Sequence, residues 1–147
     1  MTSYLLDTNV VSMLDPRRQA HAPALIDWLE RNGARLFLSV KTIVEFDAGI
    51  LELRREGKSE RADQLAALVS TIVTEFGDRV LPIDVETARL VARLGEAVHR
   101  QPVGLPDLLI AATAARHGLV LLTRNLGEIG RLGVAALDPF VDPPPET

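Results

Sequence analysis

The segment Gly104-Leu-Pro-Asp-Leu-Leu-Ile-Ala-Ala-Thr-Ala-Ala-Arg-His-Gly-Leu-Val-Leu-Leu-Thr-Arg-Asn125 predicts a helix that is followed at once by a buried strand. The helix begins near Pro106, because proline is favoured at the first helical position. It continues through the alanine-rich run to His117 and ends at Gly118, since glycine is typical of the end of a helix. Residues 119–123 then form the most hydrophobic strand that the sequence predicts.

Apolar runs and helical periodicities alternate along the rest of the chain. Pro82 keeps one apolar run away from the centre of a sheet, because proline cannot donate to the hydrogen-bond ladder. Strands that alternate with helices predict an α/β fold, with a parallel sheet covered by helices on both faces. The further strands are expected at residues 4–6, 36–38, 80–83 and 135–137, and the further helices at residues 10–14, 22–31, 40–56, 62–76 and, capped by Asp84, 84–100.

Length and composition indicate one globular domain. The 147 residues are 47% hydrophobic and 24% charged, so residues 1–141 are expected to form a single domain and residues 142–147 a flexible, proline-rich tail. Cysteine is absent, which excludes disulfides, thiolate zinc sites and a cysteine nucleophile. No apolar run approaches the roughly 18 residues of a membrane span, so a soluble, cytoplasmic protein without a membrane partner is expected.

The net charge of −4 argues against binding nucleic acid by bulk electrostatics. It is compatible with an enzyme that acts on nucleic acid, because a bound Mg²⁺ would add positive charge where the phosphate sits.

Four polar residues stand at the edges of apolar runs: Asp7, Glu45, Asp107 and Asn125. Side chains at the carboxyl ends of parallel strands meet at one edge of the sheet, and Asp7 and Asn125 follow such strands. If folding brings all four together, they form an acidic pocket of the kind that binds Mg²⁺ through oxygen ligands. Asp107 begins a helix that precedes a strand, so its place at that edge depends on tertiary packing.

Each of these residues also has a purely structural interpretation. Asp7 would serve equally well as a helix N-cap. Glu45 would serve as an edge residue that reaches solvent or pairs with Lys41, although its place between Val44 and Phe46 indicates the apolar side of the helix. Asp107 would compensate the dipole of its helix.

Asn125 would serve as a turn residue, and Glu128 is a substitute acid one turn later. The side chains that are candidates for phosphate contacts are Arg17, Arg18, Lys41 and Arg124. The histidines His21, His99 and His117 have no common metal-ligand spacing and are expected at the surface.

In order along the chain, four segments resemble the motifs of the PIN domain, and the match is to the VapC/FitB type of toxin–antitoxin ribonuclease. They are Leu5-Leu-Asp7-Thr-Asn9, Ser39-Val-Lys-Thr-Ile-Val-Glu45-Phe, Asp107-Leu-Leu-Ile-Ala-Ala-Thr-Ala114 and Leu121-Leu-Thr123-Arg-Asn125.

The resemblance implies a three-layer α/β/α sandwich with a central, mainly parallel sheet. It also implies a homodimer, a site for Mg²⁺ or Mn²⁺, RNA as the substrate and a cognate antitoxin as the partner. Asp7 and Asp107 match the principal metal ligands, and Glu45 matches the third acid. Asn125 falls where many members have Asp, and Thr123 matches a hydroxyl that supports the cluster.

The function expected from these residues is that of a Mg²⁺-dependent endoribonuclease toxin that hydrolyses RNA phosphodiester bonds, with Asp7, Glu45, Asp107 and Asn125 in the active site. Two alternatives stay open: an RNA-processing nuclease that is no toxin, and a PIN-like binding module with weak or no catalysis. A receiver-like signalling module fits poorly, because no lysine follows Lys58.

Overall fold

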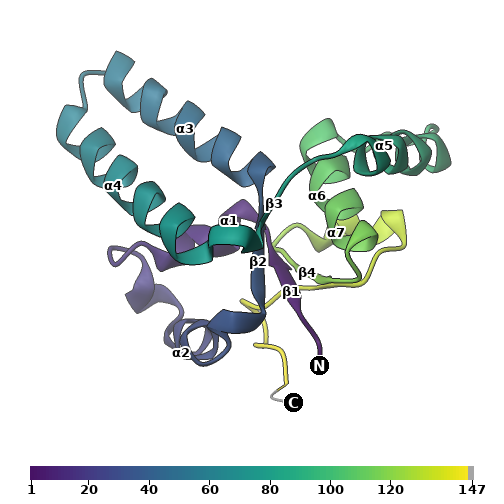
Figure 1. Cartoon of the computed structure of the whole chain (residues 1–147), viewed down its shortest axis with the longest axis horizontal. Helices are drawn as coiled ribbons and strands as arrows, with labels where there is room; N and C mark the ends of the chain where they lie inside the picture. The colour runs from purple at the N-terminus through teal and green to yellow at the C-terminus, as the bar shows by residue number, and fades with distance from the viewer. Residues whose placement is uncertain (146–147) are drawn as a thin grey trace.

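A five-stranded sheet runs through the middle of the molecule in the order β3-β2-β1-β4-β5, and every neighbouring pair is parallel (Figure 1). The structure is a computed structural model that describes residues 1–145. The strands are β1 (Tyr4–Leu6), β2 (Leu36–Ser39), β3 (Val80–Leu81), β4 (Val120–Leu122) and β5 (Ala136–Leu137).

Helices connect the strands and cover both faces of the sheet. The α-helices are α1 (Thr8–Val11), α2 (Pro23–Arg31), α3 (Val40–Arg55), α4 (Ser59–Phe76), α5 (Val85–Ala97), α6 (Leu105–Arg116) and α7 (Leu126–Ile129). Short 3₁₀ turns lie at Ser12–Leu14, Gln19–His21, Gly33–Arg35, Gly77–Arg79 and Gly130–Leu132. In the part of the chain that the structure describes, no helix has both the length and the apolar character needed to cross a membrane.

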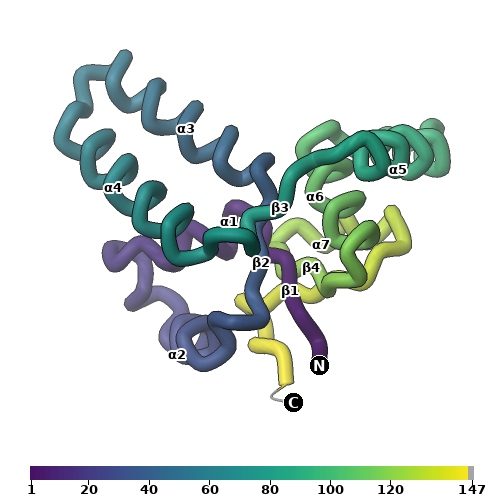
Figure 2. The backbone as a smooth tube through the Cα atoms, viewed as in Figure 1, coloured from purple at the N-terminus to yellow at the C-terminus, as the bar shows by residue number. Residues whose placement is uncertain are grey.

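The alternation of side chains along β1 creates the three layers. Tyr4 and Leu6 point to one face of the sheet and share a core with α2, α3 and α4. Leu5 points to the other face and packs against Ile110 and Ala114 of α6. Figure 2 shows the result, with α2, α3 and α4 on one side of the sheet and α5, α6 and α7 on the other. The predicted α/β/α sandwich is confirmed.

The order of the strands creates a switch point beside β1. The chain adds β2 and β3 on one side of β1, then crosses over to place β4 and β5 on the other side. In open parallel sheets, ligands bind beyond the carboxyl ends of the strands at such a point. β3 lies at the edge of the sheet, as Pro82 predicts.

The segment from α6 to β4 has the predicted form. Ala111, Ala112 and Ala114 are fully buried, so small side chains let α6 pack closely on its neighbours. The chain leaves the helix at Gly118, whose backbone φ of +65° is one that residues with a Cβ rarely adopt. The Leu119 amide then donates to the Ala114 carbonyl at 2.9 Å, which ends the helix directly before the strand.

Several helix boundaries differ from the prediction, and α4 begins at Ser59 rather than at Ala62. α5 ends at Ala97 rather than at Arg100, because the following amides of Val98, His99 and Gln101 donate three residues back, to Gly95, Glu96 and Val98, and not four. α1 begins at Thr8 rather than at Val10, because Asp7 is extended and caps the helix.

The predicted flexible tail begins at residue 142 and lies partly outside the described residues. Its residues 142–145 form no helix or strand, and Pro144 among them is buried. Tail flexibility stays a prediction.

Candidate active site at the carboxyl edge of the sheet

Asp7 lies at the switch point, directly after β1, and is only 4% exposed. Its backbone amide donates to the Leu122 carbonyl at 2.9 Å, which joins the ends of β1 and β4. Its carboxylate accepts from the Thr8 amide at 2.8 Å, from the Thr123 hydroxyl at 2.8 Å and from the Lys41 ammonium at 3.2 Å. The two interpretations of Asp7 are therefore compatible, because it caps α1 and also faces the pocket.

A chain of hydrogen bonds connects Asp7 to Asp107. The fully buried Thr123 hydroxyl donates to Asp7 and accepts from the Asn125 amide at 3.0 Å. The side-chain amide of Asn125 then donates to the Asp107 carboxylate at 2.7 Å. This contact brings the first turn of α6 to the same edge as β1 and β4, which the sequence pattern alone did not establish.

Lys41 and Glu45 approach the pocket from the first two turns of α3. The Lys41 side chain is 6% exposed, and its ammonium forms ion pairs with both Asp7 and Glu45. The Glu45 side chain is 41% exposed and accepts from the Thr8 hydroxyl at 2.9 Å.

One expectation for α3 was wrong. Glu45 does not lie on the apolar side, because Thr42, Phe46 and Ile50 form the buried face of the helix and leave Glu45 at its border. Lys41 lines the cavity with its ammonium directed to the two carboxylates, so its predicted phosphate contact stays a prediction.

These side chains border one open cavity of about 370 Å³. The four residues predicted for the active site all line it, and they come from four different segments of the chain. The complete lining is Asp7, Thr8, Asn9, Ser12, Arg18, Lys41, Glu45, Pro106, Asp107 and Asn125.

Negative charge accumulates at this cavity. Burial raises the pKa of Asp107, and the neighbouring charge of Asp7 raises this pKa further, against the opposing effect of Lys41. Burial alone would lower the pKa of Lys41, but the charges of Asp7 and Glu45 outweigh burial and raise it. The ammonium therefore stays protonated and partly compensates the three acids.

Several other predicted residues lie elsewhere. Glu128 pairs with Arg131 at 2.9 Å and does not line the cavity. The Arg124 guanidinium stacks over the Phe140 ring at 3.6 Å from the ring centre. Arg17 lines the neighbouring cavities near the start of α4. The three histidines are exposed, as predicted.

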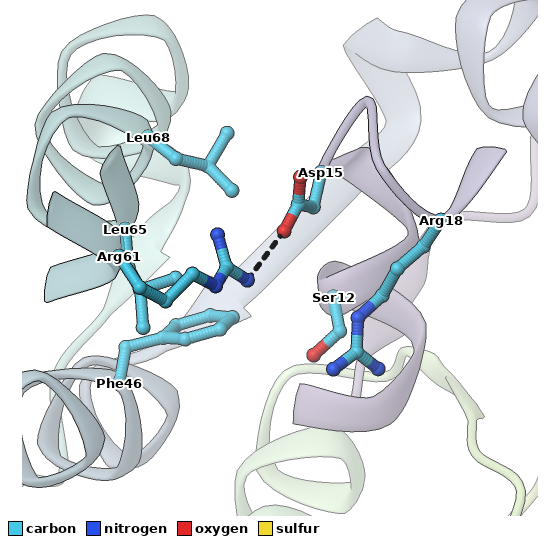
Figure 3. Close-up of a pocket in the computed structure, with 7 residues that line it drawn as sticks. All are labelled: Ser12, Asp15, Arg18, Phe46, Arg61, Leu65 and Leu68. Atoms are coloured by element: carbon cyan, nitrogen blue, oxygen red, sulfur yellow. Dashed lines mark hydrogen bonds and ion pairs between the residues drawn. The ribbon is translucent and has the colours of Figure 1, made fainter. Parts of the chain in front are cut away.

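The sequence interpretation did not single out Asp15. Figure 3 shows Arg61 reaching from α4 across a small cavity to Asp15, at 2.8 Å. The Asp15 carboxylate also accepts from the Arg17 amide at 3.0 Å, so it attaches the loop that carries Arg18 to α4. No local pattern predicts this pair, because its partners are 46 residues apart.

A parallel sheet with acidic side chains at its switch point fits a nuclease-like α/β domain, and the comparison with known families agrees. The PIN domain profile matches residues 4–132, and the chain belongs to this family.

Among curated proteins, the chain is 30% identical to Toxin FitB of Neisseria gonorrhoeae, with 94% of this chain and 99% of that protein covered. It is also 30% identical to VapC ribonuclease Y4jK of Sinorhizobium fredii, with 92% and 96% covered. Among solved structures it resembles the crystal structure of FitAcB from Neisseria gonorrhoeae, with a TM-score of 0.80, 30% identity and 93% and 98% of the two chains covered.

The donor chemistry of the cavity fits a divalent metal ion, which PIN-domain ribonucleases generally use. The groups of Asp7, Glu45, Asp107 and Asn125 offer carboxylate and amide oxygens, the ligands that Mg²⁺ prefers. Among residues 1–145, no three histidine or acidic side chains gather around a single ion position. The assignment of Asp7, Asp107 and Glu45 as metal ligands therefore stays a prediction.

Proposed function

We propose that this protein is the ribonuclease toxin of a toxin–antitoxin pair and acts in the cytoplasm, with its catalytic site at the cavity bordered by Asp7 and Asp107. The observation that supports the site most strongly is the chain of hydrogen bonds from Asp7 through Thr123 and Asn125 to Asp107. It connects two acids that are 100 residues apart in sequence at the point where parallel α/β sheets bind ligands.

Asp7 and Asp107 would hold the metal ion, Mg²⁺ or Mn²⁺, with Glu45 as the third acid. Bound there, the ion supplies Lewis-acid polarisation of a phosphoryl oxygen and a more acidic water. The protein itself fixes the orientation of the acids. Thr123 holds one oxygen of Asp7, Asn125 donates to one oxygen of Asp107, and both acids line the cavity.

RNA is the proposed substrate, because the cavity is open and positively charged side chains lie on one border. Arg18 lines the cavity, and the exposed Arg17 is next to it in the same loop. These guanidiniums would contact phosphates on either side of the cleaved bond. With a net charge of −4, the protein would depend on such local contacts rather than on bulk attraction.

A cognate antitoxin is the proposed partner, and a homodimer is the proposed assembly. The antitoxin is supported by the similarity to Toxin FitB and to the FitAcB complex. The homodimer is supported by apolar side chains on the α3–α4 hairpin, where Val44 is 67%, Leu51 59% and Val73 41% exposed. The opposite face of α4 belongs to the core, which takes Val69, Ile72 and Phe76.

A PIN-like binding module with weak or no catalysis is the second candidate. The observation that favours it is that the Lys41 ammonium contacts two of the three acids. The resemblance adds that Asn125 stands where many members have Asp.

The deciding experiment measures cleavage of an RNA substrate by the purified protein with Mg²⁺ or Mn²⁺, and with EDTA. The wild-type protein should cleave only with the metal, and Asp7→Asn and Asp107→Asn should abolish cleavage while the circular dichroism spectrum is retained. Asp27→Asn, an exposed acid on α2, is the matched control and should cleave at the wild-type rate. Cleavage by both site variants at the wild-type rate overturns the site, and no cleavage by the wild type favours the binding module.

Toxicity is tested separately in cells. Induced expression should arrest growth, and co-expression of the antitoxin encoded beside it should restore growth. Unaffected growth together with cleavage in vitro would identify an RNA-processing nuclease instead.

A further inference from the structure

A lysine occupies the space between two acids of the proposed metal site. The Lys41 ammonium is 3.2 Å from one oxygen of Asp7 and forms an ion pair with Glu45. Lys41 lines the cavity and only 6% of its side chain is exposed, so the charge is largely shielded from solvent.

The Lys41 ammonium both depends on the neighbouring carboxylates and compensates their charge. A buried positive charge is stable only when it is paired, and Asp7 and Glu45 are its ion-pair partners. In return, it compensates acids that would otherwise repel one another across the cavity. Position 41 is the first turn of α3, where Ser39 caps the helix by accepting from the Lys41 amide at 3.0 Å, so the side chain starts from a fixed backbone.

We propose that Lys41 is a built-in cation of this carboxylate site, which holds Asp7 and Glu45 in place without metal and must move away from Asp7 when a divalent ion binds. The proposal rests on the proposed function only in taking Asp7 as a metal ligand. A divalent ion on Asp7 would meet a positive charge that lies 3.2 Å from one oxygen of that carboxylate, and two cations at such short distances repel strongly. Lys41 therefore acts as a positioning residue. It lowers the affinity of the site for a metal ion, and it lets the protein fold without a metal ion.

The lysine content of the chain allows a direct test on the wild-type protein. Lys41 and Lys58 are its only two lysines, and the Lys58 side chain is 62% exposed, distant from the cavity and paired with Glu56. Lysine acylation followed by mass spectrometry should show Lys41 protected and Lys58 reactive in EDTA. Saturating Mn²⁺ should increase the rate at Lys41 several-fold and leave the rate at Lys58 unchanged. Equal protection of Lys41 with and without bound Mn²⁺ overturns the proposal.

A variant tests the energetic part of the proposal. Lys41→Met keeps the length of the side chain and removes the charge, so Mn²⁺ affinity measured by calorimetry should increase about tenfold or more, because the repulsion is lost. The variant should melt at a lower temperature than the wild type in EDTA and recover with Mn²⁺. Lys41→Arg should bind Mn²⁺ as the wild type does, and Lys58→Met is the matched control that should change nothing.

The outcomes separate this proposal from the function. Unchanged Mn²⁺ affinity in Lys41→Met overturns it, even if the enzyme cleaves RNA. If Lys41→Met does not fold in EDTA, the acylation experiment on the wild type decides alone. If neither protein binds Mn²⁺, the proposal fails together with the metal dependence of the proposed function.

Discussion

The substitution Thr123→Val tests whether one hydroxyl supports the whole candidate site. Thr123 is fully buried, donates to the Asp7 carboxylate at 2.8 Å and accepts from the Asn125 amide at 3.0 Å. Valine has the same shape, so no cavity forms and only the two hydrogen bonds are lost. A bond to a charged group contributes about 1.5–3 kcal/mol and an ordinary one about 0.5–1.5 kcal/mol, so the free energy of unfolding should fall by about 2–4 kcal/mol.

Urea denaturation in EDTA, followed by circular dichroism, measures this change. With an m-value of about 2 kcal/mol/M, the midpoint should fall by about 1–2 M. Thr113→Val is the matched control, because Thr113 is also fully buried but donates only to the Leu109 carbonyl of its own helix, at 2.8 Å. This control should lose about 1 kcal/mol or less.

RNA cleavage separates support of the site from support of the fold. Residues that orient the side chains of a metal site typically contribute about 10- to 100-fold to activity or metal affinity, so Thr123→Val should lose that much at temperatures where it is folded. Thr113→Val should lose none. Equal effects of the two substitutions on both stability and cleavage would refute the role assigned to Thr123.

Two further predictions concern acids and pH. Asp107→Asn should make the metal-free protein more stable at neutral pH, because burial and the charge of Asp7 raise the pKa of Asp107. The folded protein then binds this proton more tightly than the unfolded chain, so the stability of the wild type falls as pH rises from about 4 through the raised pKa. In thermal melts from pH 4 to 8, the melting temperature of the variant should therefore increase relative to that of the wild type. Asp15→Asn should destabilise the protein at neutral pH by about 1–3 kcal/mol, since the charged bond to Arg61 is lost. Burial would raise the pKa of Asp15, but the bonds from Arg17 and Arg61 outweigh burial and lower it, so this stability is present above pH about 4 and is lost as pH falls through the lowered pKa.

Each acid has an outcome that contradicts its prediction. For Asp107, a variant that is less stable than the wild type in EDTA at pH 7 would show that the carboxylate is compensated without metal. For Asp15, a stability difference that stays constant down to pH 3 would show that the pair with Arg61 is not the source of the effect.

The layers and most elements were predictable because local patterns determine them. Alternating apolar runs placed all five strands, Pro82 placed one of them at an edge, and the alanine-rich run before Gly118 placed α6. The candidate site was predictable as a set of residues, since Asp7 and Asn125 follow strands whose ends meet in any parallel sheet.

Contacts between distant segments were not predictable. The direction of Lys41 depends on the position of Asp7, which is 34 residues earlier, and periodicity within α3 carries no information about it. The same holds for Asp15 and Arg61, whose pairing depends on how the loop after α1 meets α4. Glu45 was misplaced because the apolar residues beside it suggested burial, whereas the helix turns only one of them, Phe46, into the core.

The bond between Thr123 and Asp7 spans 116 residues, and β4 joins β1 only after most of the polypeptide exists. During synthesis, Asp7 therefore lacks its partner Thr123 until the last third of the chain has left the ribosome. A prematurely terminated product that lacks β4 would be harmless to the cell that makes it. The candidate site thus forms only when translation is nearly complete.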